Sequence, residues 1–255
     1  MSSLTLFGPR LKVERAEHHI RKLDALFGQY VRDSMKRFRP KRNRDPLKQA
    51  RPATFPKHVP TVLGDALHNL HAALDHAYHI AADANSATFS ERRLFPFGQD
   101  RQSLEGSING HKAKGTTPSE EVITAILDEI QPYEGGKLGL YGLHKLDITD
   151  KHLVLIPTTS KVHIEQLDFV DERGAKTGGG ISNLFMTADQ GENFEFFNIG
   201  VGRAEMKGNP KDAFSICFGG GQPFEGERIS DILKSLRLAT IEAINIIGRA
   251  ANLPG

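Results

Sequence analysis

Apolar residues recur at three- and four-residue spacing in five segments of the chain, and this spacing predicts helices. The first begins near Pro9, a residue that suits a first helical turn. Another begins at Thr117-Pro118-Ser119-Glu120, which has the spacing of a capping box, and ends at Gln131-Pro132-Tyr133. The five helices are expected over about residues 9–35, 60–82, 117–130, 138–150 and 227–250.

Between the fourth and fifth predicted helices, the pattern changes to alternation and to apolar runs of strand length. The clearest alternation sets Phe214, Ile216 and Phe218 against Ser215 and Cys217. Because no helical segment separates these runs, the strands are expected to form an antiparallel sheet. The predicted strands cover residues 153–156, 162–170, 181–187, 194–201 and 213–218.

Together these elements predict one α+β domain over residues 1–255, in which a helical bundle carries an inserted antiparallel β-sheet. Residues 9–151 form the helical part and residues 152–225 the sheet. The C-terminal helix, residues 226–250, has too much apolar surface to stand alone, so we expect it to pack back on the bundle. The segment from Gly106 to Gly115 is interpreted as a glycine-rich connection.

Histidine is concentrated on the second predicted helix. With about 100° between successive residues, its leucines and alanines fall on one arc, which is the expected core face. Residues four apart lie one above the other on a helix, so Asp75 is expected to reach both His71 and His79. The opposite arc is polar and carries Asp65, His68, Asn69, His71, Asp75, His76 and His79.

A matching set lies on the fourth predicted helix, with the spacing His-x2-Asp-x2-Asp-Lys-His over residues 144–152. Imidazoles and carboxylates from two facing helices can hold a divalent metal. The same residues can instead brace the two helices as a hydrogen-bond network, and the sequence leaves both interpretations open. The candidate metal ligands are His68, His79, His144, Asp147 and His152.

Charge is balanced over the whole chain but not along it. The chain has 33 Lys and Arg residues and 31 Asp and Glu residues, for a net charge of +2. Residues 36–57 carry most of the local imbalance, and the prolines in this stretch predict an extended or looped connection. Such a segment can contact the phosphates of RNA or DNA, or it can be a solvated basic loop. The candidate phosphate-binding residues are Arg37, Arg39, Lys41, Arg42 and Arg44.

The remaining composition excludes several kinds of site. The one cysteine, Cys217, excludes an intramolecular disulfide and a multi-cysteine zinc site, and it favours a reducing compartment. No apolar run is long enough to cross a bilayer and no signal pattern is present, so we expect a cytoplasmic protein without membrane contact. The phosphate-loop, nucleophile-elbow and HExxH motifs are absent from the sequence.

Four motifs resemble the signature of a family of bacterial and phage proteins. The segment GDALHNLHAALDH, residues 64–76, is similar to the G-D-x-L-H-N-L-R-S-A-L-D-H element of that family. Residues 94–96, 130–133 and 143–152 follow in the same order and resemble its F-P, Q-P-Y and L-x2-L-D-x2-D-K-H elements. The resemblance covers about residues 9–157, and no particular activity comes with it.

The Arg-x4-His spacing of that family is in turn similar to the Arg-x4–6-His motif of HEPN-domain ribonucleases. This resemblance implies a HEPN-like helical core and a helical dimer that sets two motifs across a cleft. It also implies that His76 acts as general acid or base and that His71, in the place of the arginine, contacts the phosphate. Asp75, one turn from His71, completes the candidate catalytic set.

Three functional hypotheses follow from these observations. The first is a HEPN-like protein that binds RNA or another phosphate-containing ligand through the histidine and aspartate face of the second helix. The second is a metal-dependent hydrolase with its site between two helices, and the third is a non-catalytic structural or interaction protein. A homodimer is part of the first hypothesis, because a polar helix face can meet its own copy across a two-fold axis.

Overall fold

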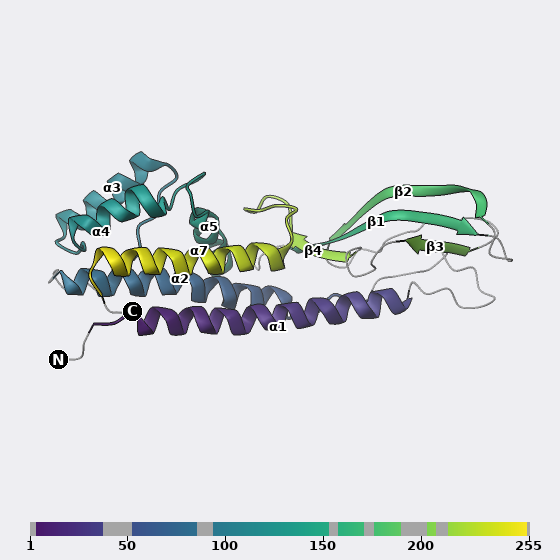
Figure 1. Ribbon diagram of the computed structural model, residues 1–255, viewed down its shortest axis with the longest axis horizontal. Coiled ribbons are helices and arrows are strands. Elements are labelled where there is room, and N and C mark those ends of the chain that lie inside the picture. Colours follow the sequence, from purple (N-terminus) through teal and green to yellow (C-terminus); the bar gives the residue numbers. More distant parts are fainter. Residues whose placement is uncertain are drawn as a thin grey trace. The chain divides into compact units, whose positions relative to one another are not determined.

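The computed structural model describes residues 4–37, 53–85, 94–152, 158–170, 176–189, 203–207 and 214–253. These residues are mostly helical (Figure 1). They divide into two compact units, the first within residues 1–22, 61–156 and 230–255 and the second within residues 23–60 and 157–229.

The five predicted helices are present, with ends that differ by a few residues from those expected. In chain order the α-helices are α1 (Phe7–Arg37), α2 (Val59–Ala84), α3 (Arg101–Ala113), α4 (Glu120–Ala125), α5 (Leu140–His152) and α7 (Ile229–Ala250). A short π-helix, η1 (Ile126–Ile130), continues α4.

The core of the first unit is built on the apolar arc of α2. The leucines and alanines that the helical period places on one face are all fully buried, which confirms the predicted core face. These residues are Leu63, Ala66, Leu67, Leu70, Ala73, Leu74 and Ala77. Across the same unit, Arg237 of α7 donates a hydrogen bond of 2.8 Å to Glu17 of α1, so the last helix contacts the first.

The interpretation of residues 106–115 as a glycine-rich connection is wrong, because most of this segment belongs to α3. The helix begins with a capping box in which Asp100 accepts a bond from the backbone of Ser103, and the Ser103 side chain accepts one from the backbone of Asp100. Leu104 and Ile108, one turn apart, are buried. Capping and burial together outweigh the helix-weakening effect of two glycines.

The third predicted helix is also more complex than its sequence pattern indicates. Helix α4 begins at Glu120, with Ser119 and not Thr117 at its N-cap and without a side-chain capping bond, so the predicted capping box does not form. The π-helix then widens the last turn, and Gln131 adopts a left-handed conformation with a φ of 54°. The expected end at Gln131-Pro132-Tyr133 is confirmed.

The strands belong to the second unit. They are β1 (Thr158–Val170), β2 (Lys176–Asp189), β3 (Arg203–Lys207) and β4 (Phe214–Phe218). The long strand β1 pairs antiparallel with β2, β3 and β4. Cys217 in β4 is buried. Because the two units are described separately, the insertion of a sheet into a helical bundle stays a prediction.

The expectations about membrane contact and about the basic segment can be compared with the described residues only in part. Among the described residues, no helix is both long enough and apolar enough to span a membrane. The basic candidates Arg39, Lys41, Arg42 and Arg44 lie outside the described residues, and Arg37 ends α1 with its side chain outside the description.

Candidate functional site

Helices α2 and α5 approach each other closely enough for their polar residues to meet. On α5, Leu143, Leu146 and Asp147 share one buried side of the helix. Gly64 of α2 permits the approach, because a Cβ atom at this position would lie 2.2 Å from a carboxylate oxygen of Asp150. A glycine in α2 therefore makes room for the acidic side of α5.

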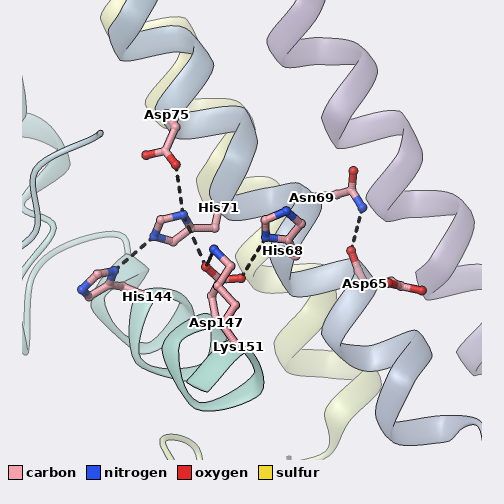
Figure 2. Close-up of polar contacts among 8 residues, drawn as sticks. All are labelled: Asp65, His68, Asn69, His71, Asp75, His144, Asp147 and Lys151. Atoms are coloured by element: carbon pink, nitrogen blue, oxygen red, sulfur yellow. Dashed lines mark hydrogen bonds and ion pairs between the residues drawn. The ribbon is translucent and has the colours of Figure 1, made fainter. Parts of the chain in front are cut away.

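Asp147 is the centre of the polar contacts between these helices. Its side chain is only 2% exposed, and its Oδ1 lies 3.2 Å from Nδ1 of His68 on α2. Its Oδ2 accepts a hydrogen bond from Nζ of Lys151, one turn further along α5. The same oxygen lies 3.6 Å from Nδ1 of His71. One buried carboxylate thus holds groups from both helices (Figure 2).

His71 and His144 form a direct imidazole pair. Nε2 of the buried His71 lies 3.1 Å from Nδ1 of His144. The two ring planes differ by only 21° and the ring centroids lie 5.4 Å apart. With 3.1 Å between the two bonded nitrogens, the rings therefore meet edge to edge and lie almost in one plane. Figure 2 shows this bond on the side of His71 that faces away from Asp75. The pair connects α2 to α5 at a second point, next to Asp147.

Carboxylates flank the other ring nitrogen of His71. Oδ2 of Asp75 lies 3.4 Å from Nδ1 of His71, as the one-turn spacing predicts, and Asp147 approaches from the other side. Asp75 is itself held by a 2.8 Å hydrogen bond from the backbone N–H of Phe95. Two carboxylates beside Nδ1 favour a proton on that nitrogen. Nε2 of a neutral His71 then accepts the proton of His144 Nδ1, which leaves Nε2 of His144 with a free lone pair.

A phenyl ring covers this imidazole pair. Phe97, in the segment between α2 and α3, stacks on His144 with ring centroids 4.2 Å apart and planes 11° apart. It also stacks on His71 at 5.2 Å and 22°. The contact site, which we call the Asp147 cluster, therefore comprises His68, His71, Asp75, Phe97, His144, Asp147 and Lys151.

Burial sets the protonation of the groups around the cluster. Burial, followed by the neighbouring His71, lowers the pKa of His144 from 6.5 to about 4. Burial also raises the pKa of Asp150, and the nearby carboxylates of Asp147 and Asp65 add to that effect. His144 is therefore a neutral base at pH 7, and the edge of the cluster near Asp150 has a negative potential.

The structure brings together five of the residues predicted from sequence: His68, His71, Asp75, His144 and Asp147. His79 is not among them, because its Nε2 pairs with Asp83 one turn further along α2. Eight residues separate His71 from His79, about 12 Å along the helix axis. The predicted contact of Asp75 with His79 is replaced by the Asp83 pair. His152 ends α5, and its side chain lies outside the description.

His76 lies on another side of α2 from His71. Its side chain is exposed, and partial burial together with the cation of Lys12 on α1 lowers its pKa. His71 is buried under Phe97 and bonded to His144, so it is not positioned to contact a phosphate. The two histidines of the HEPN-like motif therefore do not share a surface in this unit.

The predicted metal ligands are described only in part, because the side chain of His152 lies outside the described residues. Among the described side chains, no group of three or more histidine, cysteine and acidic residues could hold a metal ion. Nδ1 of His68 and Nδ1 of His71 both face the carboxylate of Asp147, and Nε2 of His71 bonds His144. The described contacts of these residues form a polar network between α2 and α5.

The sequence interpretation missed Phe97. It follows Leu94-Phe95-Pro96 directly, and nothing in its spacing connects it to His71 or to residue 144, which lie on separate helices. An aromatic residue directly after the motif was the available signal. Stacking on a histidine pair depends on the path of the chain after α2, which a local pattern does not contain.

Comparison of the chain with protein-family models, curated proteins and solved structures finds no match.

Proposed function

We propose that this chain is a metal-independent acid–base catalyst that cleaves a phosphodiester, with single-stranded RNA as its substrate. The proposal keeps the hypothesis of an RNA-binding histidine and aspartate face, and within the Asp147 cluster it assigns the proton transfers to His68 and His144 in place of His71 and His76. The observation that carries it is the buried carboxylate of Asp147, which orients an exposed imidazole, His68, and adjoins the His71–His144 pair.

The two imidazoles suit complementary proton transfers. His68 keeps Nδ1 on Asp147, and about half of its side chain is exposed, so its Nε2 is available to a ligand. His144 is neutral at pH 7 because burial lowers its pKa to about 4. Its free Nε2 can accept a proton, and His71 with Asp75 can stabilise the positive charge that results. This division of roles between base and acid is what cleavage of RNA requires.

The reaction is an attack of the RNA on its own backbone. His144 Nε2 takes the proton of the ribose 2′-OH, the 2′-oxygen forms a bond to phosphorus, and the bond from phosphorus to the 5′-oxygen breaks. Protonated His68 gives its proton to the leaving 5′-oxygen. The products are a 2′,3′-cyclic phosphate and a 5′-hydroxyl, so no oxidant, water or metal is consumed in the step.

Lys151 supplies positive charge beside this site. Its ammonium group contacts Asp147, and more than a third of its side chain is exposed. An ammonium that already bonds a carboxylate contributes less to phosphate binding than a free one, and the nearby Asp150 opposes a polyanion. The basic residues Arg37, Arg39, Lys41, Arg42 and Arg44 stay separate candidates for contact with RNA phosphates.

The experiment is cleavage of a short single-stranded RNA by untagged protein in the presence of EDTA. Loss of a general acid or base typically costs 10²–10⁴-fold in rate, so His68→Asn and His144→Asn are each expected to lower the rate by about 100-fold or more. His79→Asn, which changes a similar histidine outside the cluster, is the matched control and keeps the rate. A product with a 2′,3′-cyclic phosphate is expected.

Each other outcome assigns the activity elsewhere. Cleavage that survives both substitutions but disappears in His76→Asn transfers the chemistry to the HEPN-like motif. Cleavage that stops in EDTA and returns with manganese or zinc supports the metal-dependent hydrolase. No cleavage of any RNA by the folded protein contradicts the proposal.

A HEPN-like core with an inserted antiparallel sheet, assembled as a homodimer, is the architecture that we propose for this activity. It is supported by the resemblance of residues 64–76 and by the strand pairing around β1. Light scattering coupled to size-exclusion chromatography tests the dimer, with an expected mass of twice the 28.1 kDa of one chain. A monomer mass at every concentration contradicts it.

A structural role is the second candidate, favoured by the burial of Asp147 and His71. Here the cluster only braces α2 against α5. The double substitution His71→Ala with Asp75→Ala is expected to lower thermal stability sharply under either function. Under the structural candidate, His68→Asn is expected to change neither stability nor any activity, because the amide nitrogen can replace Nδ1 beside Asp147. The catalytic proposal instead expects a rate lower by about 100-fold or more.

A further inference from the structure

The ring of Phe97 lies over the imidazole pair. Its ring is nearly parallel to both imidazoles, 11° from His144 and 22° from His71. The imidazoles meet edge to edge through the bond from His71 Nε2 to His144 Nδ1. One phenyl face therefore covers both rings and the hydrogen bond between them.

The chain on both sides of Phe97 is tied down. The backbone N–H of Phe95 donates to Asp75, and the Phe95 ring packs edge-on against the buried Tyr78 of α2. On the other side, the N–H of Gly98 donates to the carbonyl of Pro132 at 3.2 Å. Bonds on both sides hold the backbone at Phe97 in place, from which its ring stacks on the two imidazoles.

We infer that Phe97 is a positioning residue, which keeps the His71–His144 pair in one plane and excludes water from one face of its hydrogen bond. The consequence for RNA cleavage rests on the function proposed above. The effect on the imidazoles does not, because it follows from the stacking alone. Phe97 touches no reacting atom, so its contribution passes through His144.

Charged groups also face this pair, and Phe97 acts in addition to them. From α2, His71 and Asp75 face His144, and from α5, Asp147 and Lys145 do so. The two carboxylates favour a proton on His144, whereas burial, His71 and Lys145 oppose it. Removal of the phenyl ring admits water, so it weakens the effect of burial on the pKa of His144 without changing a charge.

The test is a histidine titration followed by NMR, which needs no substrate. The His144 ring signals are assigned by their loss in His144→Asn. In Phe97→Ala the midpoint for His144 is expected to rise by about one pH unit from its value near 4, because the ring is solvated. Phe97→Tyr keeps an aromatic face and is expected to keep the midpoint. Leu94→Ala, at an exposed position of the same segment, is the control and leaves it unchanged.

A His144 midpoint that stays the same in Phe97→Ala overturns the inference. If Phe97→Ala does not fold, Phe97→Leu retains the apolar volume without a flat ring and is expected to move the midpoint in the same direction by less. If RNA is cleaved, the acid limb of the rate profile moves with the midpoint. If RNA is not cleaved but the midpoint moves, the proposed function fails and the inference about Phe97 stands.

Discussion

At the scale of single residues, substitution of Asp147 is expected to have the largest cost in stability. It is nearly inaccessible to water, and groups on two helices depend on its charge. A buried carboxylate is tolerated only when its oxygens are satisfied, and here an imidazole and an ammonium group do so. Its neighbours on the same helix face are leucines, so the residue is placed by core packing.

Asp147→Asn is expected to lower the free energy of unfolding by about 2–4 kcal/mol. The neutral amide leaves Lys151 without its counter-charge, and it has one acceptor oxygen where the carboxylate has two. Urea denaturation at pH 7 measures the change. The matched control is Asp83→Asn, which breaks the partly exposed pair with His79 and is expected to cost less than about 0.5 kcal/mol. Equal losses in the two variants contradict the central role of Asp147.

At the scale of elements, the sequence predicts a helix and its faces best where the helical spacing of apolar residues continues for many turns. Both faces of α2 could be predicted, including the contact between His71 and Asp75, because i,i+4 neighbours are a property of the helix itself. In α3 the apolar signal is only Leu104 and Ile108, and two glycines obscure it. The π-turn of η1 could not be predicted, since its residues are equally compatible with an ordinary helix.

The capping box of α3 should be measurable in isolation. Asp100→Ala removes the acceptor for the Ser103 backbone and is expected to cost about 1 kcal/mol of stability. Gln102→Ala, an exposed substitution in the same turn, is the control and is expected to change stability by less than about 0.5 kcal/mol. Thermal unfolding followed by circular dichroism compares them. No difference between the variants refutes the capping assignment.

Because α5 approaches Gly64 closely, replacement of this helical glycine by alanine is expected to have an unusual effect on stability. Alanine normally stabilises such a position by about 1 kcal/mol, but here its Cβ would meet the Asp150 carboxylate. Gly64→Ala is therefore expected to destabilise the protein by about 1–2 kcal/mol. When Asp150→Ala removes the obstacle, the same substitution is expected to become stabilising. A stabilising effect of Gly64→Ala in the parent protein excludes the close approach.

At the scale of the whole molecule, the candidate site depends on contacts that span long stretches of sequence. The pairs His68–Asp147 and His71–His144 join residues more than 70 positions apart. The sequence could predict that two helices carry matching residues. It could not predict which residues would pair, because the rotation of α5 about its axis is set by Leu140, Leu143 and Leu146.

The stability of the folded chain should depend on pH through His144. Its pKa is about 4 in the fold and near 6.5 in the unfolded chain, so the unfolded chain binds the extra proton between these values. Stability is therefore lost as the pH falls from 6.5 to 4 and is unaffected by this group above 6.5. After allowance for solvent around the partly exposed ring, the loss is about 1–2 kcal/mol.

Urea denaturation at pH 7 and pH 4.5 tests this dependence. The quantity compared between the parent protein and His144→Asn is the stability lost between the two pH values. The variant is expected to lose less stability on acidification. The opposite contribution of Asp150, whose pKa is raised, is common to both proteins. His18→Asn, at an exposed position, should behave like the parent. If His144→Asn loses as much stability as the parent, His144 is not the group responsible.

The buried thiol of Cys217 can be used to measure how often the strands open. It is the one cysteine in the sequence and lies in β4, in the second unit, whereas every residue of the Asp147 cluster lies in the first. A thiol reagent can react only when β4 opens, so its rate of labelling reports local opening of the strands. Histidine signals report the helices independently. The two measurements together can show whether β4 opens independently of the helices.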